Sequence, residues 1–155
     1  MKLEGKKGLS KIIQIVLWIG IIIGIITLIA LPFILLHLNK HLDIFVLLIY
    51  PCGILFIIMA YYFIEMFKSI ELDNAFNHKN TIKLKKSMNI CFLISLLTAI
   101  DFLITLFVYN YYTLQLKIAL VFISLLFFSV AIALYIVSEL YKKAIEYKEE
   151  NDLTI

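Results

Sequence analysis

Four long apolar segments constrain this chain more than any other feature of its sequence. They cover residues 12–36, 44–67, 88–109 and 118–141. Each is long enough to cross the hydrocarbon core of a bilayer, which takes about 20 residues in a helix. We therefore predict an all-α polytopic membrane protein, in which residues 1–155 form a single domain with four transmembrane helices.

The composition excludes a water-soluble globular domain. Hydrophobic residues make up 63% of the chain and charged residues only 16%, whereas a soluble domain has about 25% charged residues. So little charge cannot cover a surface that faces water. The first segment follows several lysines, but it is too long for the apolar region of a signal peptide and no small-residue cleavage site follows it. We expect it to remain in the mature protein.

The positions of the lysines predict how the helices are threaded. Twelve of the fourteen lysines lie before the first segment, between the second and third, or after the fourth. Lysines beside membrane spans stay on the cytoplasmic side. We therefore predict that both termini, the loop 68–87 and the tail 142–155 are cytoplasmic. The two outer connections are short, so the four helices should form two antiparallel hairpins.

Small residues on the first two segments are candidates for helix packing. Gly20, Gly24 and Thr27 share one face of the first segment, and Gly53 and Ala60 share one face of the second. Helices associate in lipid through close packing at such residues. The faces either pack helices together within the chain or form a homodimer interface. Four segments in one chain provide neighbours, which favours the first interpretation.

A polar stripe on the third segment is the candidate site inside the membrane. Its members recur at steps of three and four residues, which places them on one helical face: Cys91, Ser95, Thr98, Asp101 and Thr105. A mid-membrane Asp costs about 2.5–3.5 kcal/mol on the insertion scale, so the stripe should face the bundle interior. We expect Asp101 to be protonated or to meet a basic side chain from an outer loop. It then serves a proton, ion or substrate path, or it joins helices by hydrogen bonds.

Two glutamates lie at the inner ends of the second and fourth segments. Glu65 precedes Lys68 by three residues, and Glu139 precedes Lys142 and Lys143 by three and four. Residues at this spacing are neighbours on a helix surface. The sequence therefore predicts ordinary ion pairs within each helix.

The histidines and cysteines offer little support for a metal site. His37 and His41 lie four residues apart beside Asp43, a candidate clamp if this turn were helical. A zinc site needs further ligands on rigid structure, and the chain has to reverse here within a few residues. Cys52 and Cys91 fall near opposite sides of the membrane, which argues against a disulfide or a thiolate metal site. We predict no metal and no cofactor.

The cytoplasmic segments are predicted from their caps and charges. Asn77 is a good N-cap residue, so the third helix should begin near His78, below the membrane. The tail after Tyr141 is either a helix that frays into a disordered end or a short acidic docking peptide with Leu153 and Ile155 as anchors.

These cytoplasmic segments carry a family resemblance. The run Phe76-Asn-His-Lys-Asn80-x-x-x-Leu84 resembles the F-T-x-E-N-x-x-x-L signature of YoaS-like small bacterial membrane proteins, with Asn77 and Lys79 in place of the usual Thr and Glu. The closing Lys-Glu-Glu-Asn-Asp-Leu-Thr-Ile resembles the characteristic end of that family. Its members are often encoded beside a small helix-turn-helix regulator, so the resemblance implies a membrane partner for a transcription factor. The candidate partner contacts are Phe76, Asn80, Leu84, Asp152, Leu153 and Ile155.

Together these features favour a regulatory or interaction protein of the bacterial cell membrane that acts with a cytoplasmic partner, such as a helix-turn-helix regulator. The alternative is a small transporter, channel or bacteriocin-immunity-type protein that uses the stripe around Asp101. An enzyme is not expected, because the sequence has no convergent catalytic groups and no glycine-rich phosphate loop. Direct nucleic-acid binding is not expected either, because the lysines lie at the membrane surface. Besides lipid, a second copy of the chain is a candidate partner.

Overall fold

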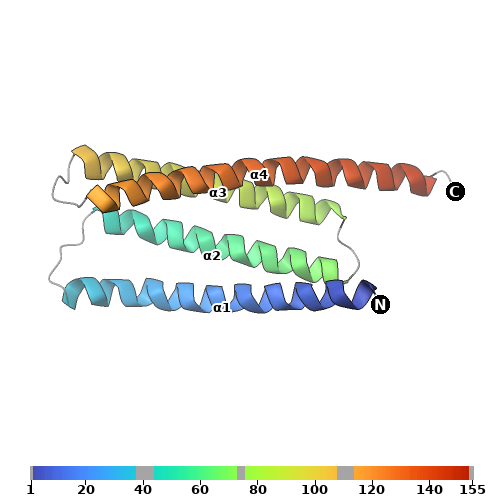
Figure 1. Ribbon diagram of the computed structural model, residues 1–155, viewed down its shortest axis with the longest axis horizontal. Coiled ribbons are helices and arrows are strands. Elements are labelled where there is room, and N and C mark those ends of the chain that lie inside the picture. Colours follow the sequence, from blue (N-terminus) through green and yellow to red (C-terminus); the bar gives the residue numbers. More distant parts are fainter. Residues whose placement is uncertain (1, 38–43, 73–75, 108–113, 154–155) are drawn as a thin grey trace.

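The computed structural model describes residues 2–37, 44–72, 76–107 and 114–153, and the side chains of 8–33, 48–72, 76–107 and 114–151. The described residues form four helices: α1 (Lys2–His37), α2 (Ile44–Glu71), α3 (His78–Phe107) and α4 (Leu114–Leu153) (Figure 1). Each of them is long and apolar enough to cross a membrane. The predicted all-α class with four membrane-spanning helices is therefore confirmed.

The helices extend beyond the apolar segments. α1 has 36 residues and α4 has 40, which correspond to about 54 Å and about 60 Å at 1.5 Å per residue. A hydrocarbon core is only about 30 Å thick, so both helices have ends that lie outside it. α4 continues through most of the predicted tail to Leu153. The predicted fraying after Tyr141 is therefore wrong, because the segment contains no glycine or proline that would end the helix.

The start of α3 agrees with the sequence prediction. The backbone N–H of Asn80 donates to Oδ1 of Asn77 at 2.8 Å, the geometry of an N-cap that satisfies one of the first free donors of a helix. Asn77 also donates through Nδ2 to Oγ of Ser69 at 2.9 Å. The cap residue therefore ties the beginning of α3 to the last turns of α2.

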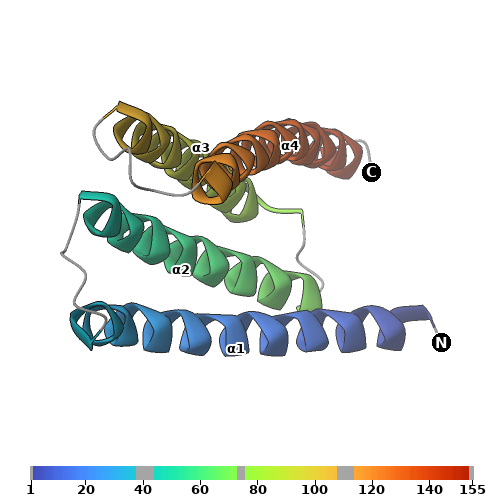
Figure 2. The ribbon, with the colours of Figure 1, turned by 60° about the vertical axis from the view of Figure 1, so that its left-hand side comes forward.

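The helices run in alternating directions and pack in series. α1 packs against α2, α2 against α3, and α3 against α4. Figures 1 and 2 show α2 between α1 and the α3–α4 pair, with the N- and C-terminal ends at the same end of the molecule. Among the described residues, no Cα atom of α1 lies within 8 Å of a Cα atom of α4. The four helices therefore form an open row, and not a closed ring.

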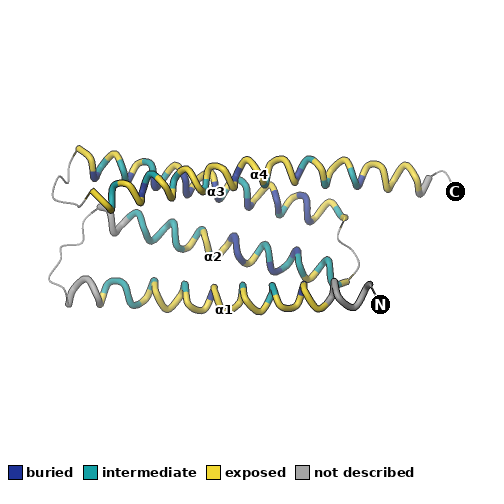
Figure 3. The backbone as a smooth tube through the Cα atoms, in the orientation of Figure 1, coloured by how far each residue is buried: buried dark blue, intermediate teal, exposed yellow. Residues whose placement is uncertain are grey.

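Burial is concentrated on one face of α3 (Figure 3). Many of the buried residues on this face are polar or small, whereas α1 exposes large apolar side chains over most of its surface. A soluble protein shows the opposite arrangement. The distribution fits helices that are surrounded by lipid and held together by polar contacts and close packing.

Small residues determine how closely α1 approaches α2. Gly24 and Gly53 each face a side chain of the other helix, and a Cβ on Gly53 would lie 2.7 Å from Cδ2 of Leu28. Ala60 is buried in an α1–α2 cluster. Gly20 has no atom near its Cβ direction, so it does not contribute to this packing. Whether Gly20 forms a homodimer interface stays a prediction.

Candidate functional site

The five stripe residues lie on the buried face of α3. All of them are inside the helix assembly (Cys91, Ser95, Thr98, Asp101 and Thr105). These residues face the interior because a polar group that faces lipid has no water to hydrogen-bond with, which raises the free energy of the protein. The structure thus places the stripe on the interior face that the sequence analysis expects.

Two serines join α3 to α4 by reciprocal hydrogen bonds. The hydroxyl of Ser95 donates to the backbone carbonyl of Ser124 at 3.0 Å, and the hydroxyl of Ser124 donates to the carbonyl of Ser95 at 3.0 Å. Ser124 was not among the predicted site residues, because a lone serine in an apolar segment gives no signal of its partner. The pair accounts for the polar character of this part of the stripe.

The two threonines of the stripe are satisfied within their own helix. Thr98 donates to the carbonyl of Ile94 at 2.9 Å, and Thr105 donates to the carbonyl of Phe102 at 2.9 Å. Bonds of this kind to a carbonyl one turn back are common for threonine in helices. Neither hydroxyl therefore needs a ligand or a second helix.

Asp101 is different from the rest of the stripe. Its exposed fraction is 1%, and its Oδ1 has no hydrogen-bond partner. An unsatisfied buried acceptor costs about 1–3 kcal/mol, and more if the group is charged. No described basic side chain bonds to Oδ1, so the expected pairing with a base is not seen at this oxygen. The second interpretation of Asp101, a hydrogen bond that joins two helices, does not explain Oδ1 either, because this oxygen accepts no hydrogen bond from the described residues.

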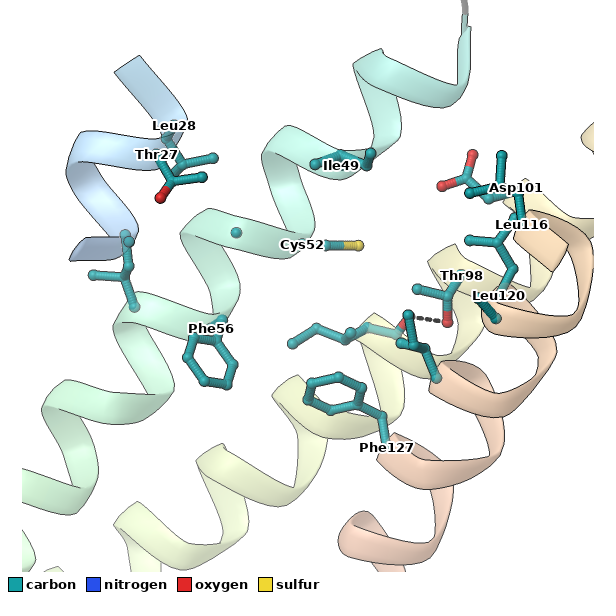
Figure 4. Close-up of a pocket in the computed structure, with 16 residues that line it drawn as sticks. Thr27, Leu28, Ile49, Cys52, Phe56, Thr98, Asp101, Leu116, Leu120 and Phe127 are labelled. Carbon is teal, nitrogen blue, oxygen red and sulfur yellow. Dashed lines mark hydrogen bonds between the residues drawn. The ribbon is translucent and has the colours of Figure 1, made fainter. Parts of the chain in front are cut away.

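Asp101 lines a cavity of about 450 Å³ that is bounded by residues from all four helices (Figure 4). The lining is almost entirely apolar. It consists of Gly24, Thr27, Leu28, Ile49, Cys52, Gly53, Phe56, Ile57, Ile94, Thr98, Asp101, Leu116, Ala119, Leu120, Ile123 and Phe127.

The cavity has a polar end and an aromatic end. Figure 4 shows the carboxyl group of Asp101 directed toward α2, where Ile49 and Cys52 lie. At the other end, the rings of Phe56 and Phe127 meet edge to face with centroids 6.4 Å apart. Thr27 also lines the cavity, but its hydroxyl already donates to the carbonyl of Ile23. The free acceptor of Asp101 is therefore the distinctive chemical feature of the cavity.

A second cluster of polar residues lies at the end of the molecule that holds both termini. Ion pairs there join each helix to the next one along the chain. They are Lys11–Glu71 at 3.4 Å, Lys83–Glu65 at 3.1 Å and Lys85–Glu139 at 3.1 Å. His78 and Glu149 lie 3.2 Å apart and form a further ion pair when the histidine is protonated. Their side chains remain partly exposed, so each pair contributes only modestly to stability.

These ion pairs correct the sequence prediction for the two glutamates. Glu65 pairs with Lys83 of α3, and Glu139 pairs with Lys85 of α3, whereas the sequence spacing predicted lysines of their own helices. The prediction was wrong because the early turns of α3 continue below the apolar segment. There they bring lysines between the glutamates of α2 and α4.

The predicted partner contacts fall into two groups. Phe76 is half-exposed and packs against the ring of Tyr141 in a tilted arrangement, with ring centroids 5.1 Å apart. Asn80 and Leu84, by contrast, have exposed fractions of 1% and 2%. They pack inside the assembly, and Asn80 also lines a small pocket at the start of α3. Their role as partner contacts stays a prediction.

The remaining candidates lie at the ends of helices. Asp152 and Leu153 form the last turn of α4, but their side chains and Ile155 lie outside the described residues. The same applies to the side chain of His37 and to His41, the candidate metal pair. No cluster of three or more metal-binding side chains occurs within the part of the chain that the structure describes.

Comparison with known proteins gives a family and no function. No curated protein and no solved structure matches the chain. A family model described as "Protein of unknown function (DUF2975)" matches residues 6–155, which agrees with the resemblance to YoaS-like membrane proteins. Because the match covers nearly the whole length, the chain belongs to the DUF2975 family of proteins of unknown function.

Proposed function

We propose that this protein is a non-enzymatic membrane protein of regulatory or interaction type, whose cytoplasmic helical end binds a cytoplasmic partner such as a helix-turn-helix regulator. The observation that carries the proposal is the continuation of α4 beyond its apolar segment as a charged helix to Leu153. The lysine distribution supports an orientation with both termini in the cytoplasm. That orientation presents this helix to soluble proteins of the cell.

The end of α4 is suited to carry contacts. Ile145 is buried and holds the helix to the rest of the protein, while Tyr147 is 66% exposed. Glu149 and Glu150 are exposed, and together with Asp152 they form an acidic run in the sequence. Regulators that bind DNA carry basic surfaces, so an acidic helix end is complementary to such a partner. Because this segment is already helical, less conformational entropy is lost when a partner binds.

The test begins with the neighbouring genes, where the family resemblance implies a helix-turn-helix regulator. That regulator is purified and its direct binding to the membrane protein is measured. The full chain in nanodiscs should retain this regulator on a column, and deletion of residues 151–155 should abolish retention. The double variant Leu153→Ala/Ile155→Ala should weaken it strongly. Thr154→Ala, which lies between these two positions, is the matched control and should bind normally. Equal retention by the deletion variant, or none by the intact protein, would refute the proposal.

Orientation needs a separate measurement. A reporter that is active only in the cytoplasm should be active after Ile155, and one that is active only outside should be silent there. The opposite result would place the end of α4 out of reach of any cytoplasmic regulator.

A second function is favoured by the buried carboxyl of Asp101 beside the cavity. A small transporter, channel or immunity-type protein would use such a group as its polar contact inside the membrane. Proteoliposomes should then show proton or solute flux that is lost in Asp101→Asn while folding is retained. Flux that is the same in Asp101→Asn would remove the residue from any transport path.

A further inference from the structure

We propose that the cavity bounded by Asp101, Phe56 and Phe127 binds a lipophilic amine, with the amine nitrogen at the Asp101 carboxyl and the apolar body against the two rings. The inference does not depend on a cytoplasmic partner. It also holds whether or not the bound molecule crosses the membrane.

The size and lining of the cavity fit a small organic molecule. Its volume of about 450 Å³ falls within the range of about 300–1,000 Å³ that is typical of ligand sites. Such sites combine a mostly apolar lining with few polar groups that orient the ligand. Here the orienting group is a carboxyl that is 1% exposed and directed into the cavity (Figure 4).

The chemistry of the carboxyl selects an amine. Oδ1 of Asp101 lacks a donor, so the ligand should carry an N–H or O–H group. In an apolar lining an ionised carboxylate is stable only beside a counter-charge. An amine meets both needs, because the pair remains neutral as a whole whichever partner holds the proton. An alcohol supplies an O–H donor but no counter-charge, and the carboxylate of Asp101 would repel an anion.

The serial packing of the helices provides a route from the bilayer. α1 contributes Gly24 and Thr27 to the lining and α4 contributes Ala119, yet the described parts of these two helices do not pack together. The side of the cavity between α1 and α4 is therefore not closed by a helix–helix contact. A lipophilic molecule dissolved in the bilayer could enter there without first crossing water.

The experiment measures binding of tritiated 4-phenylbutylamine to the full chain in nanodiscs, with empty nanodiscs as the partition control. Wild type should bind one amine per chain above the control. 4-Phenylbutanol, the matched neutral ligand, should bind at least about tenfold more weakly, since one charge-assisted hydrogen bond is worth about that factor. The comparison of the two ligands needs no substitution and so does not depend on the folding of a variant.

Three variants complete the test. Asp101→Asn, nearly isosteric, should weaken amine binding at least about tenfold and leave the alcohol unaffected. Ala119→Phe should block both ligands by filling the cavity. Thr105→Val is the matched control, because Thr105 lies on the same stripe outside the cavity lining and bonds only to its own helix. It should bind like wild type.

Four outcomes would overturn the proposal. Amine retention equal to that of empty nanodiscs would show that the cavity is not a site. Equal affinity for the amine and the alcohol would indicate an apolar pocket for lipid chains. Unchanged amine binding by folded Asp101→Asn would exclude the carboxyl as the contact. Oxidative cross-linking of two chains through Cys52, which lines the cavity, would show that a second copy occupies it. None of these results bears on regulator binding.

Discussion

The paired serines between α3 and α4 permit a quantitative test of the bundle. Replacing Ser95 by Ala removes one interhelical bond of 3.0 Å, and replacing Ser124 by Ala removes the reciprocal bond of 3.0 Å. Hydrogen bonds between membrane helices contribute about 0.6 kcal/mol on average and about 1.7 at most. Each single variant should therefore lower the free energy of unfolding by about 0.6–1.7 kcal/mol.

The double variant should lose less than the sum of the two single losses, because the two serines also contact each other. In both bonds the acceptor is a backbone carbonyl, which the substitutions leave in place. The two hydroxyls also lie within hydrogen-bond distance of each other, at 3.4 Å. Either single variant therefore removes their mutual contact, and the coupling between the two substitutions should be about 0.5 kcal/mol or more. The measurement is reversible unfolding in mixed micelles titrated with SDS, followed by far-ultraviolet circular dichroism.

Ser129→Ala provides the matched control on α4. Ser129 is exposed and donates to the carbonyl of Leu126 in its own helix at 2.8 Å, so its loss should not affect the α3–α4 contact. If Ser95→Ala and Ser124→Ala destabilised the protein no more than Ser129→Ala, the reciprocal bonds would not hold these helices together. A double variant that lost the full sum of the two single losses would contradict the coupling between the two hydroxyls.

Three further predictions concern packing, charge and capping. Gly53→Ala should destabilise the α1–α2 contact by about 1 kcal/mol, because its Cβ would lie 2.7 Å from the terminal Cδ2 of Leu28 on α1, which has to move aside. Gly20→Ala, which meets open space, should be neutral or stabilising in the same SDS titration. Lys83→Glu should lower the unfolding midpoint by placing like charges together, and the exchange Lys83→Glu/Glu65→Lys should recover much of the loss; failure to recover would argue against this pair. Asn77→Ala should cost about 1 kcal/mol as a lost N-cap and increase hydrogen exchange at the start of α3, and unchanged exchange would contradict the capping role.

The open row of helices also bears on the candidate functions. A closed four-helix bundle would bury the stripe of α3 from every side. Here α2 and α4 cover α3, while α1 contacts only α2 within the part of the chain that the structure describes. The cavity at Asp101 arises from this arrangement, because α1 and α4 contribute to the lining without packing on each other.

Much of the fold could be predicted from the sequence. Hydrophobic segment length determines that four helices can cross a bilayer, since the backbone must satisfy its own hydrogen bonds in lipid. The N-cap role of Asn77 at the start of α3 could also be predicted, because capping involves only residues a few positions apart in the chain. The interior face of α3 could be read from the periodic positions of Ser95, Thr98 and Asp101.

Contacts between helices could be decided only by the tertiary structure. Glu65 and Glu139 pair across to α3, and Ser124 meets Ser95, because helix register and rotation bring these side chains together. The cavity at Asp101 depends in the same way on which helices pack and which do not. The apolar segments are almost uniformly hydrophobic, and lipid tails are as apolar as their side chains, so hydropathy does not encode rotation or neighbours. Close packing and a few polar contacts determine the rotation and the neighbours of each helix. These contacts can be identified only in the tertiary structure.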